Sequence, residues 1–280
     1  MDTTPLRKLE NTAARCRRKV IRMIEAGHAG HMGGALSCLD IVTALYFYAM
    51  KVDPRNPQMP GRDRFILSAG HKCMAQYAAL AQKGFFDEKV LDTYGALNTK
   101  LPGHPDMHKL PGVEANTGAL GHGLSIALGM ALGLRIDGKK ARVFVVMGDG
   151  ELAEGSNWEA AAAAAHHKAG NIVLFVDHNG LQISGRTVDV MNMDPVEDRF
   201  AAFGWGVATI NGNDMAEIVN VLDSVPLKAG KPSVIVANTV KSRGLSFAEG
   251  KAEYHYWKPN AEELKKAIDE LDRKIEETAL

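Results

Sequence analysis

Two short apolar runs in the middle of the chain each end at a cluster of polar residues. Residues 143–146 (VFVV) and 172–176 (IVLFV) are rich in β-branched and aromatic residues, which is typical of strands buried on both faces. An alanine-rich stretch of helical length lies between them, beginning near Glu154 and ending at Gly170. This order predicts one β-α-β unit of a parallel sheet.

The same alternation of apolar runs and amphipathic stretches extends along the rest of the chain. Further strands are predicted at residues 62–68, 207–210 and 232–238. Helices are predicted at residues 4–26, 38–50, 71–83, 117–134, 214–227 and 260–278. Strands that alternate with helices indicate an α/β fold, a doubly wound and mostly parallel sheet with helices on both faces. We expect a single domain over residues 1–280, because no tandem repeat or long linker interrupts the pattern.

Composition and charge narrow the class of protein. The 280 residues are 46% hydrophobic and 24% charged, with a formal net charge of zero, which suits a domain with a sizeable core. The chain has no excess of basic residues, so its charge gives no reason to expect binding to nucleic acid or to a membrane surface. The charged N-terminal stretch is unlike a secretory signal, and no apolar run reaches the ~18 residues of a transmembrane helix. Three scattered cysteines, Cys16, Cys38 and Cys73, favour a reduced, cytoplasmic chain.

Candidate chemistry lies where the two central strands end. Asp149, between Gly148 and Gly150, follows the first strand, and Asn179 follows the second. In open parallel sheets ligands bind beyond the carboxyl ends of the strands, and Mg²⁺ prefers oxygen ligands that it shares with phosphates. The glycines allow close approach of a phosphate, and the next helix directs its N-terminus there. Gly-Asp-Gly alone is a common turn, but its pairing with Asn179 favours a Mg²⁺-diphosphate site.

Several blocks of sequence resemble the N-terminal half of transketolases. Gly-Asp-Gly followed about thirty residues later by Asn is similar to the thiamine diphosphate motif. The remaining blocks are GHMGGALS at 30–37, DRFILSAGH at 63–71, LPGHP at 101–105, TGALG at 117–121 and TVK at 239–241. The resemblance covers about residues 10–260 and implies a thiamine diphosphate-binding domain of the PP type, the domain that holds the diphosphate.

The resemblance also implies roles for individual residues. Asp149 and Asn179 would ligate Mg²⁺ through their side chains, and Leu181 would do so through its backbone carbonyl. His31 and His104 would contact the sugar near the reacting carbon, and His255 matches a further active-site histidine. The residues implied to contact or support the cofactor are His71, Gly118, Leu120, Gly148, Gly150, Glu154 and Asn179.

The resemblance also implies that this chain is one half of a split transketolase. Such an enzyme transfers a two-carbon ketol unit from a ketose or ketose phosphate to an aldose, as in pentose phosphate metabolism. Neutral imidazoles suit the proton transfers, which makes His31 and His255 the candidate acid–base groups. The family also needs a glutamate from a pyrimidine-binding domain. We expect a separate C-terminal subunit to supply that domain, in a two-plus-two heterotetramer.

Two alternatives stay open at this point. One is half of another thiamine diphosphate enzyme, such as one similar to deoxyxylulose-phosphate synthase or a transketolase for an unusual sugar. The other is a non-catalytic binding protein with the same fold. Tyr256 and Trp257 stand where the family usually has Gly, and His122 stands where it commonly has Gln. Lys241 and Arg243, just after the strand at 232–238, are candidates for phosphate contacts.

Overall fold

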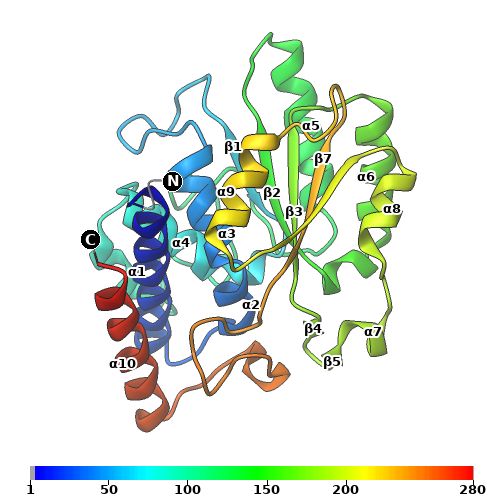
Figure 1. Cartoon of the computed structure of the whole chain (residues 1–280). Helices are drawn as coiled ribbons and strands as arrows, with labels where there is room; N and C mark the ends of the chain where they lie inside the picture. The colour runs from blue at the N-terminus through cyan, green and yellow to red at the C-terminus, as the bar shows by residue number, and fades with distance from the viewer. Residues whose placement is uncertain (1–3, 280) are drawn as a thin grey trace.

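A five-stranded parallel sheet forms the centre of the molecule (Figure 1). The computed structural model describes residues 4–279. The strands run in the order β1-β2-β3-β7-β6, with every neighbouring pair parallel. Their bounds are β1 Arg64–Leu67, β2 Val143–Gly148, β3 Ile172–His178, β6 Gly206–Asn211 and β7 Ser233–Asn238. The predicted doubly wound α/β fold is confirmed, and the two strands of the predicted β-α-β unit are neighbours.

Helices cover both faces of this sheet, because alternate residues of each strand point to opposite sides. Phe144 and Val146 of β2 face one core, and Val143, Val145 and Met147 face the other. The first core is covered by α1 Thr4–Gly27, α2 Met32–Ser37, α3 Leu39–Ala44, α4 Cys73–Lys83, α9 Met215–Ser224 and α10 Ala261–Glu277. The second core is covered by α5 Gly123–Ile136, α6 Gly155–His166 and α8 Val196–Ala202.

The terminal helices match the predicted ranges and pack against each other. The Asn11 side chain of α1 donates to the carbonyl of Ile275 in α10 at 2.8 Å. Asn260 and Glu263 form a reciprocal capping box, which explains why α10 begins at Ala261. Within residues 4–279, no helix has both the length and the apolar character that a membrane span requires.

Several predicted element ends are wrong, each for a local reason. The alanine-rich helix α6 ends at His166, before Gly170, because Lys168 adopts a left-handed conformation with φ 51° and closes the helix end. Helix α9 stops at Ser224, before Pro226, which cannot continue a helix. The helix predicted at 38–50 consists of α3 and a π-helical turn, η1 Leu45–Ala49.

The two glycine-rich entries to helices are irregular. Helix α4 begins at Cys73 after a 3-10 turn, η2 Gly70–Lys72. Helix α5 begins at Gly123 instead of residue 117. Residues 117–122 cannot be helical because Gly118 and Gly121 have φ values of 147° and 84°. This turn lies against Gly70, where a Cβ atom would be 2.7 Å from the Gly118 nitrogen.

Short elements near the strand ends complete the fold. A small hairpin, β4 Leu181–Gln182 and β5 Gly185–Arg186, follows β3 and leads into α7 Thr187–Val190. The other short turns are η3 Glu88–Thr93, η4 Gly150–Ala153 and η5 Ala252–His255. The hairpin and η5 are in contact, so both lie at the carboxyl edge of the sheet.

Candidate active site

The two turns predicted to bind a cation meet at the carboxyl edge of the sheet. Gly148 of β2 is in register with Asp177 of β3, so the residues that follow them are neighbours. Asp149 Oδ2 accepts a hydrogen bond from the Gly180 nitrogen at 2.6 Å, and its Oδ1 accepts one from the Gly150 nitrogen at 2.9 Å. The carboxylate is buried and directly links the two turns.

A cavity of about 320 Å³ opens beside these turns. All of the predicted site residues except His104 and Glu154 line it, and they come from segments that are distant in sequence. They are His31, His71, Gly118, Leu120, Gly148, Asp149, Gly150, Asn179, Leu181 and His255. A larger cavity of about 520 Å³ lies between α1 and α10 and contains none of these residues.

The three predicted metal ligands are all hard oxygen donors. The Asn179 Oδ1 atom lies 3.1 Å from the Leu181 nitrogen, and the Leu181 carbonyl accepts from Lys241 Nζ at 3.1 Å. Among residues 4–279, no three His, Cys, Asp or Glu side chains gather as metal ligands. One carboxylate, one amide and one carbonyl form a donor set that fits Mg²⁺ sharing its coordination with substrate phosphates.

Glycines keep the backbone accessible at the floor of the cavity. A Cβ atom on Gly150 would lie 3.1 Å from the Gln182 side chain, and one on Gly148 would lie 3.2 Å from Lys72 Nζ. Side chains at these positions would fill the space beside Asp149. The residues present therefore fit a cation and the diphosphate group of a cofactor.

Four histidines converge beside the two turns that carry Asp149 and Asn179. The His31 ring centroid lies 5.3 Å from that of His71, 5.5 Å from that of His255 and 6.5 Å from that of His104. His31, His71 and His255 line the cavity, whereas His104 is exposed beside it. Tyr256, one of the departures from the family pattern, packs edge-on against His31 with centroids 4.8 Å apart.

Burial keeps three of these imidazoles neutral at neutral pH. Burial and the neighbouring Lys72 lower the pKa of His71 to about 2. Burial and Lys241 lower the pKa of His255 to about 4, and burial with the nearby His104 lowers the pKa of His31. An uncharged imidazole offers one N–H donor and one nitrogen acceptor, so these side chains can hydrogen-bond to hydroxyl or phosphate groups in the cavity.

Two lysines in the cavity lining are almost fully buried. Lys72 is 3% exposed and bonds Asp177 Oδ2 through its Nζ atom at 2.5 Å. Lys241 is 2% exposed, and its Nζ atom contacts the Leu181 carbonyl and His255 Nδ1. Burial and the nearby Lys72 lower the pKa of Lys241 to about 8. Lys241, a candidate for a phosphate contact, therefore lines the same cavity as Asp149 and Asn179, and so does Lys72, which was not predicted.

Glu151 is a second site residue that the sequence reasoning missed. Its Oε1 atom accepts from the Gly121 nitrogen at 2.9 Å and from the Ser68 hydroxyl, and its Oε2 atom accepts from the Gly148 nitrogen at 3.2 Å. It therefore joins β1, β2 and the 117–122 turn. Lys72 follows His71 and Glu151 follows Gly150 in the sequence, so their adjacency to motif residues was the available signal.

Some candidate residues lie outside the cavity. Glu154 is exposed at the start of α6 and does not line the cavity. The Arg243 guanidinium pairs with Glu249 at 3.3 Å and is also absent from the lining. His122 is exposed and bonds the Leu120 carbonyl.

Comparison with known proteins gives a consistent result. Residues 9–274 match the family described as transketolase, thiamine diphosphate binding domain. The chain is 42% identical over 268 residues to a subunit of the apulose-4-phosphate transketolase of Phocaeicola vulgatus, covering 96% of this chain and 95% of that one. It is also 42% identical to a 6-deoxy-6-sulfo-D-fructose transketolase subunit of Clostridium sp. (strain MSTE9), with 95% of this chain and 96% of that one covered.

A solved structure extends the comparison to three dimensions. The transketolase of Campylobacter jejuni superposes on 94% of this chain with a TM-score of 0.88 and 33% sequence identity. The match covers 42% of that longer chain, so this chain corresponds to one part of a full-length transketolase. The chain belongs to the transketolase family and corresponds to its thiamine diphosphate-binding domain.

Proposed function

We propose that this chain is the thiamine diphosphate-binding subunit of a two-chain transketolase, a transferase that moves a two-carbon ketol unit from a ketose to an aldose. The observation that carries this proposal is the convergence of Asp149, Asn179 and the Leu181 carbonyl with His31, His71 and His255 on one cavity. A cation site beside neutral imidazoles is the combination that this chemistry needs.

The site residues of this chain fall into two groups, those that would bind the cofactor and those that would transfer protons. Asp149, Asn179 and Leu181 would hold Mg²⁺, while Lys241, His71 and the Gly150 backbone would face the diphosphate. Thiamine diphosphate, when bound, supplies the carbanion that cleaves and forms the carbon–carbon bond. His31 and His255, whose rings lie 5.5 Å apart, would accept and return the proton of the sugar hydroxyl, and His104 would bind the sugar at the mouth of the cavity.

The names of the relatives suggest a class of substrate for this chain. The two curated relatives are named for different sugars, apulose-4-phosphate and 6-deoxy-6-sulfo-D-fructose. Both sugars carry an anionic group, and we therefore propose an anionic ketose donor for this chain. The pentose phosphate assignment expected from the sequence is narrower than this proposal.

A partner subunit completes the enzyme in this proposal. The relatives that match over nearly their whole length are named as subunits of transketolases. We propose that the partner supplies the pyrimidine-binding domain and its glutamate, in a two-plus-two assembly. The exposed position of Glu154 beside Gly121 suits a contact with another chain.

The alternative of a non-catalytic binding protein requires the catalytic residues to be dispensable. The histidine cluster argues against it, because a protein that only binds the cofactor has no need for four imidazoles around one opening. Activity in the reconstituted enzyme separates the two possibilities.

The test is reconstitution with the partner chain that carries the pyrimidine-binding domain. Ketol transfer from an anionic ketose to an aldose should appear when the two chains are mixed with thiamine diphosphate and Mg²⁺, and neither chain alone should be active. Turnover by this chain alone would overturn the two-chain proposal. A mixed complex that forms, binds cofactor and stays inactive on every ketose tested would favour the binding protein.

A further inference from the structure

Asp177 is the fully buried carboxylate beneath the predicted cation site, and four side chains donate to it. Its Oδ2 atom accepts from Ser37 Oγ at 2.6 Å, Lys72 Nζ at 2.5 Å and Asn179 Nδ2 at 3.2 Å. Its Oδ1 atom accepts from the Thr239 hydroxyl. With both oxygens occupied by protein donors, Asp177 is not available as a metal ligand, although it lies only two residues before Asn179.

The contact with Asn179 determines which end of that amide faces the cavity. An asparagine amide has an oxygen acceptor at one end and an NH₂ donor at the other, and the two ends have nearly the same shape. Asp177 and, more weakly, Ser37 Oγ at 3.4 Å accept from the NH₂ end, and the Leu181 nitrogen donates to the oxygen at 3.1 Å, so the oxygen is directed away from Asp177. An NH₂ group in its place would repel a cation.

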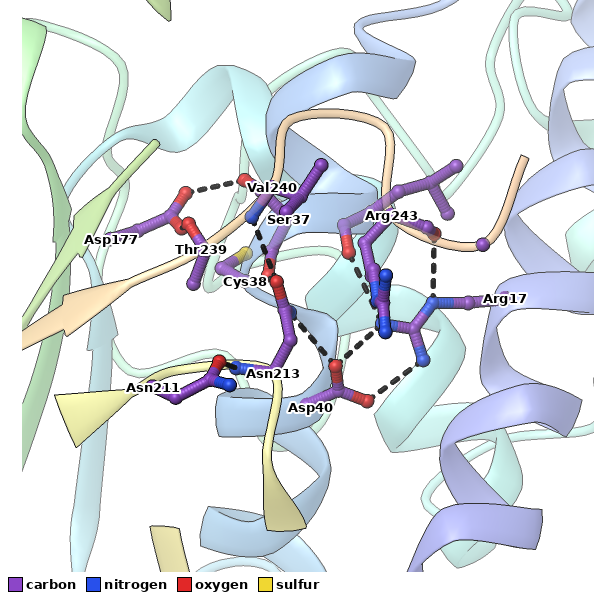
Figure 2. Close-up of polar contacts among 12 residues, drawn as sticks. Arg17, Ser37, Cys38, Asp40, Asp177, Asn211, Asn213, Thr239, Val240 and Arg243 are labelled. Atoms are coloured by element: carbon purple, nitrogen blue, oxygen red, sulfur yellow. Dashed lines mark hydrogen bonds and ion pairs between the residues drawn. The ribbon is translucent and has the colours of Figure 1, made fainter. Parts of the chain in front are cut away.

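The carboxylate that performs this orientation is itself fixed by a wider hydrogen-bond network that runs from the buried Asp177 toward the surface (Figure 2). Ser37 belongs to α2, and the backbone carbonyl of Ser37 accepts from Asn213 Nδ2 at 3.1 Å. Asn213 Nδ2 also donates to Asp40 Oδ2 at 2.9 Å, and Asn213 Oδ1 accepts from the Val240 nitrogen at 2.8 Å. Asp40 in turn pairs with Arg17 of α1.

The same network holds the turn that carries the second buried lysine. Thr239 is tied to Asp177, the Val240 nitrogen to Asn213, and the Arg243 carbonyl accepts from Arg17 Nε at 3.0 Å. Lys241 lies in the chain between the residues that these three hydrogen bonds hold, Val240 on one side and Arg243 on the other. One set of connected contacts therefore fixes both Asn179 and Lys241 relative to Asp149.

We propose that Asp177 is a positioning residue of the cofactor site, which with Lys72, Ser37 and Thr239 holds the Asn179 amide with its oxygen toward the cation. This inference rests on the proposed function, because it assigns Asn179 as a metal ligand. Lys72 balances the negative charge of Asp177, so the pair orients the ligand without changing the net charge of the site. Groups that orient metal ligands typically account for a 10–100-fold change in affinity.

The experiment measures Mg²⁺-dependent binding of thiamine diphosphate to the full chain by calorimetry. The first variant, Lys72→Met with Asp177→Asn, removes both charges of the buried pair and leaves the net charge unchanged. We expect this double variant to weaken Mg²⁺-dependent binding at least about tenfold. The second variant, Thr239→Val, removes one donor to Asp177 while keeping the side-chain volume, and should weaken binding by a smaller factor.

An Asn179→Asp background separates orientation from general damage. A carboxylate has an oxygen at both ends, so its orientation no longer matters for cation binding. In this background, removal of the Lys72–Asp177 pair should not weaken binding, because Asp177→Asn also removes the like charge that faces the new carboxylate across the 3.2 Å contact. A purely structural role would produce the same loss in both backgrounds.

A matched control is available at the opposite edge of the sheet. Asp63, just before β1, is a buried carboxylate that accepts from the Arg142 and Lys51 nitrogens at 2.7 and 2.9 Å. Asp63→Asn should lower the melting temperature but leave cofactor affinity unchanged, since it lies far from the carboxyl ends of the strands.

Three outcomes overturn the inference. Equal losses in the wild-type and Asn179→Asp backgrounds would assign Asp177 a structural role alone. Unchanged affinity in the double variant, or in Thr239→Val if the double variant does not fold, would remove the positioning role. Failure of the wild-type chain to bind thiamine diphosphate with Mg²⁺, both alone and mixed with the partner chain, would overturn the proposed function as well, whereas the first two outcomes overturn this inference alone.

Discussion

The histidines around the cavity are neutral at neutral pH because the fold buries them. His71 and His255 have pKa values lowered to about 2 and about 4, and an unfolded chain restores values near 6.5. Below about pH 6.5 the unfolded state therefore binds protons that the native state does not, and stability falls as the pH falls. Above that pH the effect is absent.

This predicts a pH-dependent loss of stability that the buried histidines cause. Urea unfolding midpoints should fall between about pH 7.5 and about pH 5, and the fall should be smaller in His71→Gln and His255→Gln than in the wild-type chain. The same exchange at the exposed His122 is the control and should leave the fall unchanged. An identical pH dependence in the wild type and all three variants would contradict the burial argument.

At the scale of single residues, the sequence predicted those site residues that are recognisable by their chemical type and by their position after a strand. Asp149 and Asn179 follow strands, and parallel strand ends meet at one edge, so their proximity could be inferred. Lys72 and Glu151 adjoin motif residues, but this adjacency alone does not predict that a charged side chain is buried in the site. Their burial depends on partners that are distant in sequence, namely Asp177 and Ser68.

At the scale of single elements, helix α5 provides a test of packing because it contains glycines in different surroundings. A Cβ atom on Gly123 would lie 2.4 Å from the Ser68 Cβ atom and 2.7 Å from its Cα atom. Gly129, in the same helix, has nothing within 4 Å of the equivalent position. The difference arises because α5 begins directly against the end of β1, while Gly129 lies on the exposed side of the helix.

Replacing each of these glycines by alanine should therefore have opposite effects on stability. Gly123→Ala should destabilise the chain by about 1–3 kcal/mol, because the backbone of β1 must move. Gly129→Ala should stabilise it by up to about 1 kcal/mol, because alanine favours the helix. Chemical denaturation of both variants measures this difference. If Gly123→Ala is as stable as Gly129→Ala, the close packing of α5 on Ser68 is wrong.

The elements themselves could be predicted where the hydrophobic pattern is strong. All five strands of the main sheet were predicted within a few residues of their observed bounds. The irregular 117–122 turn, the π-helical η1 and the β4–β5 hairpin were not predicted. Gly118 and Gly121 adopt backbone conformations that the sequence permits but does not require, and η1 depends on tertiary packing around Tyr46.

At the scale of the whole molecule, α1 is tied to the site by a buried ion pair. Arg17 of α1 bonds both oxygens of Asp40 in α3 at 2.7 and 2.8 Å, with side chains 8% and 10% exposed. The next residue, Arg18, makes a more exposed pair with Asp272 of α10 at 3.2 Å. The two arginines are adjacent in sequence and differ mainly in burial.

Loss of the buried pair should therefore cost much more than loss of the exposed one. Arg17→Met leaves Asp40 buried without its cation and should destabilise the chain by about 3–5 kcal/mol. Arg18→Met should cost no more than about 1 kcal/mol, because water screens exposed pairs. Equal effects of the two substitutions in urea unfolding would show that the Arg17–Asp40 pair does not hold α1 in place.

The arrangement of the whole molecule explains why the sequence alone did not predict that the four histidines lie together. The four histidines come from the loop before α2, from η2, from the 101–105 segment and from η5. Nothing in their spacing predicts convergence, and the resemblance to transketolases alone suggested it. The strand order β1-β2-β3-β7-β6 brings these segments to one edge of the sheet.

The central claim is that this edge of the sheet binds thiamine diphosphate through a divalent cation. The most direct test is calorimetry of the full chain with thiamine diphosphate, in the presence and absence of Mg²⁺, for the wild type and Asp149→Ala. We predict saturable binding that requires Mg²⁺ and that Asp149→Ala abolishes while the variant stays folded. Absence of binding by the wild type both alone and mixed with its partner chain, or equal binding by a folded Asp149→Ala variant, would contradict the claim.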